Sequence, residues 1–164
     1  MIILGIDPGL ATMGYGVIEV AGNSRRAIQY GVLSTRANEP TPLRLRAIFQ
    51  GVNELLDIYR PDEVAFEELF FVRNVTTGIG VSAARGAALV AVATRTDDLY
   101  EYTPMQIKQA VTGYGHADKQ QVQRMVKALL NMDEIAKPDD AADALAVALT
   151  HANSMQMKKL FKIK

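Results

Sequence analysis

The sequence contains no cysteine or tryptophan and has only two histidines, His116 and His151. Without cysteine there can be no disulfide and no thiolate metal site. The shortage of histidine also argues against a histidine-rich zinc site. Any metal ion would therefore bind among oxygen ligands, which favours magnesium or manganese.

The chain also lacks a net charge and a long uninterrupted apolar run. Its 18 basic and 18 acidic side chains balance, which argues against indiscriminate binding to polyanions but allows a polarised surface. The N-terminus does not have the order of regions typical of a signal peptide. The most apolar helical stretch, residues 78–94, is short for a membrane span and is interrupted by Arg85. We expect a cytoplasmic protein with no membrane contact.

The length and the apolar content fit one domain with a substantial core. The chain has 164 residues, of which 49% are hydrophobic, so it can bury a core without covalent cross-links. No internal repeat, low-complexity block or linker divides it. Residues 155–164 form a basic tail, expected to be solvated or frayed, with lysines at positions 158, 159, 162 and 164.

The order of the expected elements predicts an α/β fold with a mixed sheet. Three strands at 2–7, 15–20 and 27–34 are joined by short connections, which favours an antiparallel meander. A helix then begins with Thr41 as its N-cap and Pro42 at its first position. The later elements are a strand at 63–66 that continues into Glu67, a helix to about 94, a strand at 99–102, and helices beginning near 104, 118 and 138.

Asp7 ends the first strand, where Pro8 and Gly9 turn the backbone. A carboxylate on a buried strand must be paired, hydrogen-bonded, protonated or bound to a metal, because an isolated buried charge is very costly. It could equally accept backbone N–H groups of its own turn. Asp7 alone leaves both interpretations open.

Three more acidic residues are not easily explained as surface charge. Glu67 ends the fourth strand, and if that strand is a parallel neighbour of the first, both carboxylates lie at one edge of the sheet. Asp140 and Asp143 are three residues apart on one helix face. Asp139 is four residues before Asp143, so the spacing does not separate it from Asp140. Asp143 is the only charged residue of 141–149, so it faces either the core or a site, with a deficit of basic partners.

Converging carboxylates without thiol or imidazole ligands would repel one another and raise their pKa values. Two magnesium ions about 3.5–4 Å apart would relieve this repulsion, activate a water and stabilise the leaving oxygen of a phosphodiester. The alternative is one hydrogen-bonded core acid and three cap or surface acids.

The acidic residues and their surroundings resemble the RuvC family of Holliday-junction resolvases, within the ribonuclease H-like superfamily. The resemblance spans nearly the whole chain, and its order and spacing make it specific. It rests on Gly5 to Gly9, Gly14 to Gly16, Phe66-Glu67 with Phe70, Gln106 to Gln109, and Asp140 to Ala146.

The resemblance implies a ribonuclease H-like fold with a five-stranded mixed sheet flanked by helices, over a single domain of residues 1–164. It implies a homodimer, with the helix at 77–94 in its interface, that cuts a four-way DNA junction by paired symmetric nicks. It further implies two Mg²⁺ ions per site, or Mn²⁺ in their place, and a branch-migration helicase as a partner. The metal-binding and catalytic carboxylates it selects are Asp7, Glu67 (rather than Glu68), Asp140 (rather than Asp139) and Asp143.

The resemblance also suggests DNA contacts at Lys108, Lys119, Phe70 and Arg73. Lys119 falls in the first turn of a helix, where a cation opposes the helix dipole; phosphate contact or simple solvation would both explain it. Phe70 precedes a second phenylalanine and could belong to the core. An exposed aromatic beside Arg73 would suit stacking on unpaired bases.

Three other functions remain open at this point. The opening strand and turn also occur in ATP-binding modules of the actin, Hsp70 and sugar-kinase kind, whose glycines approach phosphate. Those proteins normally close two such domains on the nucleotide. The same fold also serves ribonuclease H-like nucleases that act on RNA. A junction-binding dimer without catalysis is the third alternative.

Overall fold

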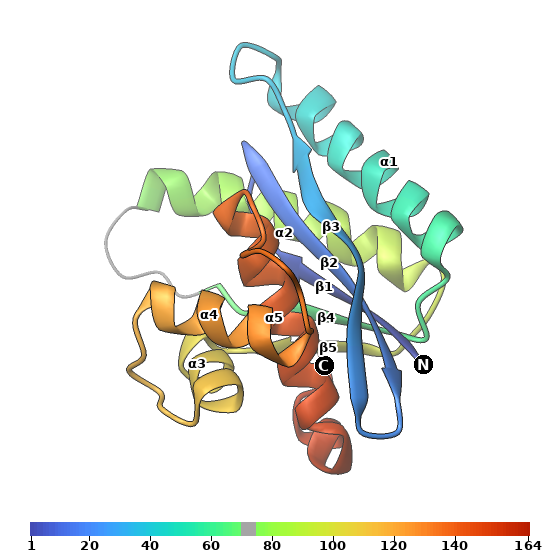
Figure 1. Ribbon diagram of the computed structural model, residues 1–164. Helices are drawn as coiled ribbons and strands as arrows, with labels where there is room; N and C mark the ends of the chain where they lie inside the picture. Colours follow the sequence, from blue (N-terminus) through green and yellow to red (C-terminus); the bar gives the residue numbers. More distant parts are fainter. Residues whose placement is uncertain (70–74) are drawn as a thin grey trace.

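In the computed structural model, which describes residues 1–69 and 75–164, five strands form one mixed sheet in the order β3-β2-β1-β4-β5 (Figure 1). β1 pairs antiparallel with β2, and β2 with β3, which confirms the meander. β4 lies parallel to both β1 and β5. The strands are β1 Ile2–Asp7, β2 Thr12–Ala21, β3 Ser24–Ser34, β4 Glu63–Glu67 and β5 Leu99–Tyr102.

Helices cover both faces of the sheet (Figure 1). α1 and α2 share an apolar core with one face, and α3, α4 and α5 share a second core with the other. Successive side chains of β1 point to opposite faces of the sheet, so this strand contributes to both cores. Ile3 faces α5, whereas Leu4 and Ile6 face α1 and α2. The helices are α1 Thr41–Tyr59, α2 Val75–Ala93, α3 Pro104–Thr112, α4 Lys119–Leu129 and α5 Asp139–Asn153, followed by the 3₁₀ helix η1 Met155–Leu160.

The helix starts follow the sequence except at α1. Capping boxes begin α3 and α4, with Thr103 and Asp118 as the N-caps. At α1 the expectation was wrong by one residue, because Pro40 occupies the N-cap position and Thr41 is already helical. No side chain caps this helix, so its first N–H groups are left to other partners.

The apolar side chains along α4 are only partly buried. Val122 and Val126 lie in the core, but Met125 and Leu129 are 37% and 38% exposed. The polar Gln123 is buried in their place, with 7% of its surface exposed. α4 is therefore rotated so that one polar side chain reaches the first turn of α5.

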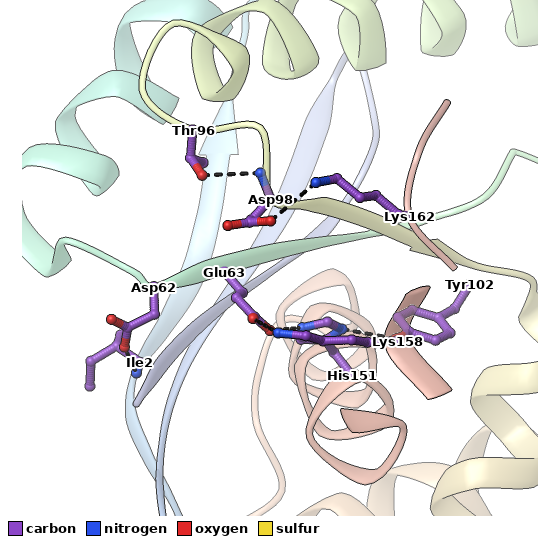
Figure 2. Close-up of polar contacts among 9 residues, drawn as sticks. All are labelled: Ile2, Asp62, Glu63, Thr96, Asp98, Tyr102, His151, Lys158 and Lys162. Carbon is purple, nitrogen blue, oxygen red and sulfur yellow. Dashed lines mark hydrogen bonds and ion pairs between the residues drawn. The ribbon is translucent and has the colours of Figure 1, made fainter. Parts of the chain in front are cut away.

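The C-terminal segment packs against the sheet, so the expectation of a frayed tail was wrong for its central part (Figure 2). Lys158 forms an ion pair with the buried Glu63 of β4. Lys162 pairs with Asp98, and its backbone bridges to Tyr100 of β5. These partners could not be read from the tail's composition, because they come from distant strands.

Among the described residues, no helix is long and apolar enough to cross a membrane.

Candidate active site

Three glycines allow the first half of α5 to lie directly on β1 and β2. A Cβ atom on Gly14 would come within 2.0 Å of the backbone carbonyl oxygen of Asp140, and one on Gly5 within 2.2 Å of that of Ala144. A Cβ atom on Gly16 would come within 2.8 Å of the backbone nitrogen of Leu145. No larger residue fits these positions without moving α5, so the glycines set the position of the two aspartates that α5 carries.

Alternation along the parallel strands brings Asp7 and Glu67 to the face of the sheet covered by α5. Asp7 has the same parity as Ile3, which packs in the α5 core, and Glu67 has the same parity as Ala65. The register pairs Ile6 with Phe66, so the two acids end adjacent strands together. Both lie at the carboxyl edge, the usual location of ligands in open α/β sheets.

The carboxylates of Asp7, Glu67, Asp140 and Asp143 are electrostatic neighbours. Burial, followed by the charges of Glu67, Asp143 and Asp140, raises the pKa of Asp7 to about 8. Burial, then the charge of Asp143, raises the pKa of Glu67 to about 7. The pKa of Asp143 is also raised, chiefly by burial. The site therefore holds more negative charge than its own basic residues compensate.

Lys119 forms an ion pair with one of these acids. Its Nζ lies 3.0 Å from Oδ2 of Asp143 and 3.4 Å from Oδ2 of Asp139. The expectation that Asp143 lacks a basic partner was therefore wrong. The partner comes from the first turn of α4, and nothing in the sequence around Asp143 reveals it.

Lys119, Asp143, Glu67 and Lys108 line one cavity of about 240 Å³ between α3, α4 and α5. Its remaining walls are apolar. Two acids and two lysines thus face the same solvent-accessible space. A negatively charged group with a bound cation would match this distribution of charge.

Asp139 and Asp140 take different directions although they are consecutive. Asp139 is half exposed, and its Oδ1 accepts a hydrogen bond from Nε2 of Gln123 at 3.1 Å. Asp140 is partly buried, and its charge raises the pKa of Asp7, which the charge of Asp139 does not. Both charges raise the pKa of Asp143. The contacts of Asp139 are therefore with α4, whereas Asp140 is an electrostatic neighbour of Asp7.

The donor set suits a hard divalent cation, but the ligands are not preorganised around one. All four candidate ligands are carboxylates, the oxygen donors that Mg²⁺ and Mn²⁺ prefer. Within residues 1–69 and 75–164, no three acidic or histidine side chains are arranged closely enough to hold a metal ion as they stand. The ammonium of Lys119 supplies positive charge at Oδ2 of Asp143. The assignment of the four acids as metal ligands remains a prediction.

The other expected site residues have different outcomes. Lys108 and Lys119 line the cavity with Glu67 and Asp143. Phe70 and Arg73 lie outside the described residues.

A second polar group, which the sequence analysis missed, lies at the opposite end of β4 (Figure 2). His151 of α5 lies 2.5 Å from Oε2 of Glu63 through Nε2, and 2.8 Å from the Tyr102 hydroxyl through Nδ1. Both His151 and Glu63 are buried. The one hint in the sequence is a histidine that closely follows the apolar run of residues 144–149.

Comparison with known proteins gives one family. The family model described as "Crossover junction endodeoxyribonuclease RuvC" matches residues 3–151. A protein of that name from Alkaliphilus metalliredigens is 54% identical over 164 residues, covering 100% of both chains. Another, from Brevibacillus brevis, is 54% identical over 152 residues, covering 93% of this chain and 92% of its own.

The solved structures agree with this result. Thermus thermophilus RuvC is 42% identical, covers 96% of each chain and superposes with a TM-score of 0.89. The same protein in complex with a Holliday junction substrate gives a TM-score of 0.91, at the same identity and coverage. The yeast mitochondrial resolvase Ydc2, at 15% identity and a TM-score of 0.69, covers 96% of this chain and 83% of its own and shares the fold.

Proposed function

This chain belongs to the RuvC family of crossover junction endodeoxyribonucleases, and on that premise we propose that it resolves four-way DNA junctions by paired symmetric nicks. The observation that carries the proposal is that Asp7 and Glu67 end adjacent parallel strands, where the charges of Glu67, Asp140 and Asp143 raise the pKa of Asp7. Four acids at one ligand-binding edge fit metal-assisted attack of water on a phosphodiester.

We propose that Asp7, Glu67, Asp140 and Asp143 hold Mg²⁺, or Mn²⁺ in its place, as two ions per site. When bound, the metal would activate a water and stabilise the leaving oxygen. The protein's own part is to fix the carboxylates, through the glycine contacts of α5, and to compensate the charge of the phosphate. Lys108 and Lys119 lie in the right cavity for that second role.

We further propose that residues 1–164 form one nuclease domain and that two copies act as a homodimer. A two-fold axis would set two identical sites against two symmetry-related strands of the junction. The small residues of α2 would permit close approach at the interface. A branch-migration helicase that delivers the junction is part of the same proposal.

The test is a cleavage assay on the purified chain with a four-way junction, a linear duplex and an RNA–DNA hybrid of matched length. We expect magnesium-dependent, paired nicks on the junction only, and none in the presence of a chelator. Asp7→Asn should abolish cutting while junction binding persists. Preferential cutting of the hybrid, or activity retained by Asp7→Asn, would contradict the proposal. Tight ATP binding without junction cleavage would favour the ATP-binding alternative.

A further inference from the structure

Side chains on one face of α4 contact two carboxylates of α5. Lys119 and Gln123 are four residues apart and therefore lie on the same side of the helix. Nε2 of Gln123 donates to Oδ1 of Asp139 at 3.1 Å, while Nζ of Lys119 lies between Oδ2 of Asp139 and Oδ2 of Asp143. The ammonium thus has one partner inside the acidic group and one outside it.

Asp139 is held in the orientation that this sharing requires. Its Oδ1 is occupied by Gln123, which is almost fully buried, and lies 3.4 Å from Nζ of Lys137. This leaves Oδ2 for Lys119. The capping box at Asp118 fixes the start of α4, so the backbone of Lys119 is also set.

The ammonium of Lys119 contacts a carboxylate that the proposed metal site includes. A divalent cation that binds Oδ2 of Asp143 must displace or repel a positive charge 3.0 Å from that oxygen. Asp139 lies on the other side of the ammonium and can keep it after displacement. Because Lys119 and Asp143 line the same cavity, an ammonium kept there still faces the space proposed for DNA phosphate.

We propose that Lys119 is a tethered cation that Asp143 and Asp139 share until a divalent metal binds, and that Asp139 is a positioning residue that then retains the ammonium beside the cavity. This inference rests on the proposed function, since it takes Asp143 as a metal ligand. It assigns a role to an acid that the resemblance leaves out.

The first test is calorimetric titration of Mn²⁺ into the DNA-free full chain. Lys119→Gln removes the competing cation, so Mn²⁺ should bind about threefold to tenfold more tightly than to the wild type. Lys137→Gln is the matched control, because it removes a charge that contacts Asp139 but not Asp143. It should change the affinity by less than about twofold. Unchanged or weaker binding by Lys119→Gln would overturn the proposal.

A double-mutant cycle tests the role of Asp139. Asp139→Asn should weaken Mn²⁺ binding by about twofold to fivefold in the wild type, since the displaced ammonium loses its remaining partner. In the Lys119→Gln background the same change should have no effect. An equal loss in both backgrounds would show that Asp139 acts only through its charge, which would overturn its positioning role.

Asp7→Asn separates a failure of this inference from a failure of the proposed function. If Asp7→Asn binds Mn²⁺ as the wild type does, the metal site itself is wrongly placed, and both proposals fail. If Asp7→Asn loses binding while Lys119→Gln is unchanged, only the tethered-cation proposal fails. Thermal unfolding of each variant shows whether it is folded before titration.

Discussion

Glu63 and Glu67 stand at the two ends of β4 and face the same helix, but among the described residues only Glu63 forms ion pairs. Glu63 contacts His151 and Lys158. Glu67 shares its cavity with Asp143, and burial and that neighbouring charge raise its pKa to about 7. One strand therefore carries a structural carboxylate at one end and an undercompensated one at the other.

The first prediction concerns the pH dependence of stability in the metal-free protein. The pKa of Asp7 rises from 3.8 to about 8 on folding, so the unfolded chain loses this proton first and stability falls as pH rises between those values. Asp7→Asn removes this cost. At pH 8 in a chelator we expect it to be more stable than the wild type by about 2 kcal/mol, with little difference at pH 4.

Urea unfolding at both pH values measures this difference. Asp57→Asn, on the exposed surface of α1, is the control and should show no such growth with pH. A wild type that matches Asp7→Asn at pH 8 would mean that the Asp7 carboxylate is not under electrostatic strain.

The second prediction concerns the contact between β2 and α5. Gly14→Ala places a methyl group against the backbone carbonyl of Asp140, so α5 must move. We expect a loss of about 1–3 kcal/mol of stability and a larger proportional loss of junction cleavage than of junction binding. Gly22→Asn serves as control, because Gly22 has open space around it and a positive φ that asparagine tolerates. Equal cleavage by the two variants would contradict the role given to Gly14.

The third prediction concerns the polar group at the other end of β4. Glu63→Gln removes the charge that meets Lys158 and weakens the contact with buried His151, so we expect a loss of about 1–3 kcal/mol in urea unfolding. Glu19→Gln removes an exposed ion pair with Arg26 and should cost less than about 1 kcal/mol. If both variants unfold alike, Glu63 does not anchor the C-terminal segment.

The fourth prediction concerns DNA binding by the cavity lysines. Lys108→Ala or Lys119→Ala should each reduce the magnitude of the slope of log affinity against log salt concentration by roughly 0.9. A variant that makes one phosphate contact fewer releases fewer counterions from the DNA when it binds. Fluorescence anisotropy with a labelled junction in chelator measures the slope. Arg95→Ala, on the α1 and α2 side of the sheet, should leave the slope unchanged. A slope unaffected by Lys108→Ala would place that residue away from DNA.

The sequence was sufficient for the features that depend on local pattern. Alternation and short turns predicted the meander, and the end of an apolar strand marked Asp7 and Glu67. The helix starts near 104 and 118 were also correct, and both are formed by capping boxes whose hydrogen bonds lie within four residues. The local pattern was wrong by one residue at the start of α1. Thr41 was expected to be the N-cap, but Pro40 holds that position and Thr41 is the first residue of the helix.

Features that depend on distant contacts could not be predicted. Consecutive residues on a helix differ in direction by about 100°, but only the packing of α4 shows that Asp139 contacts Lys119 and Gln123. The same holds for Lys158, whose partner Glu63 is 95 residues away in the chain. The resemblance selected Asp140 over Asp139 but gave Asp139 no role.

The close packing of α5 on Gly5, Gly14 and Gly16 determines which parts of the enzyme can be varied by engineering. Backbone touches backbone there, so a combinatorial library that varies these glycines or the facing residues of α5 would consist mostly of misfolded clones. The lysine-bearing wall formed by α3 and α4 is built from side chains and can be randomised instead. Changed cleavage preference should be sought at that wall, with the floor of the pocket left intact.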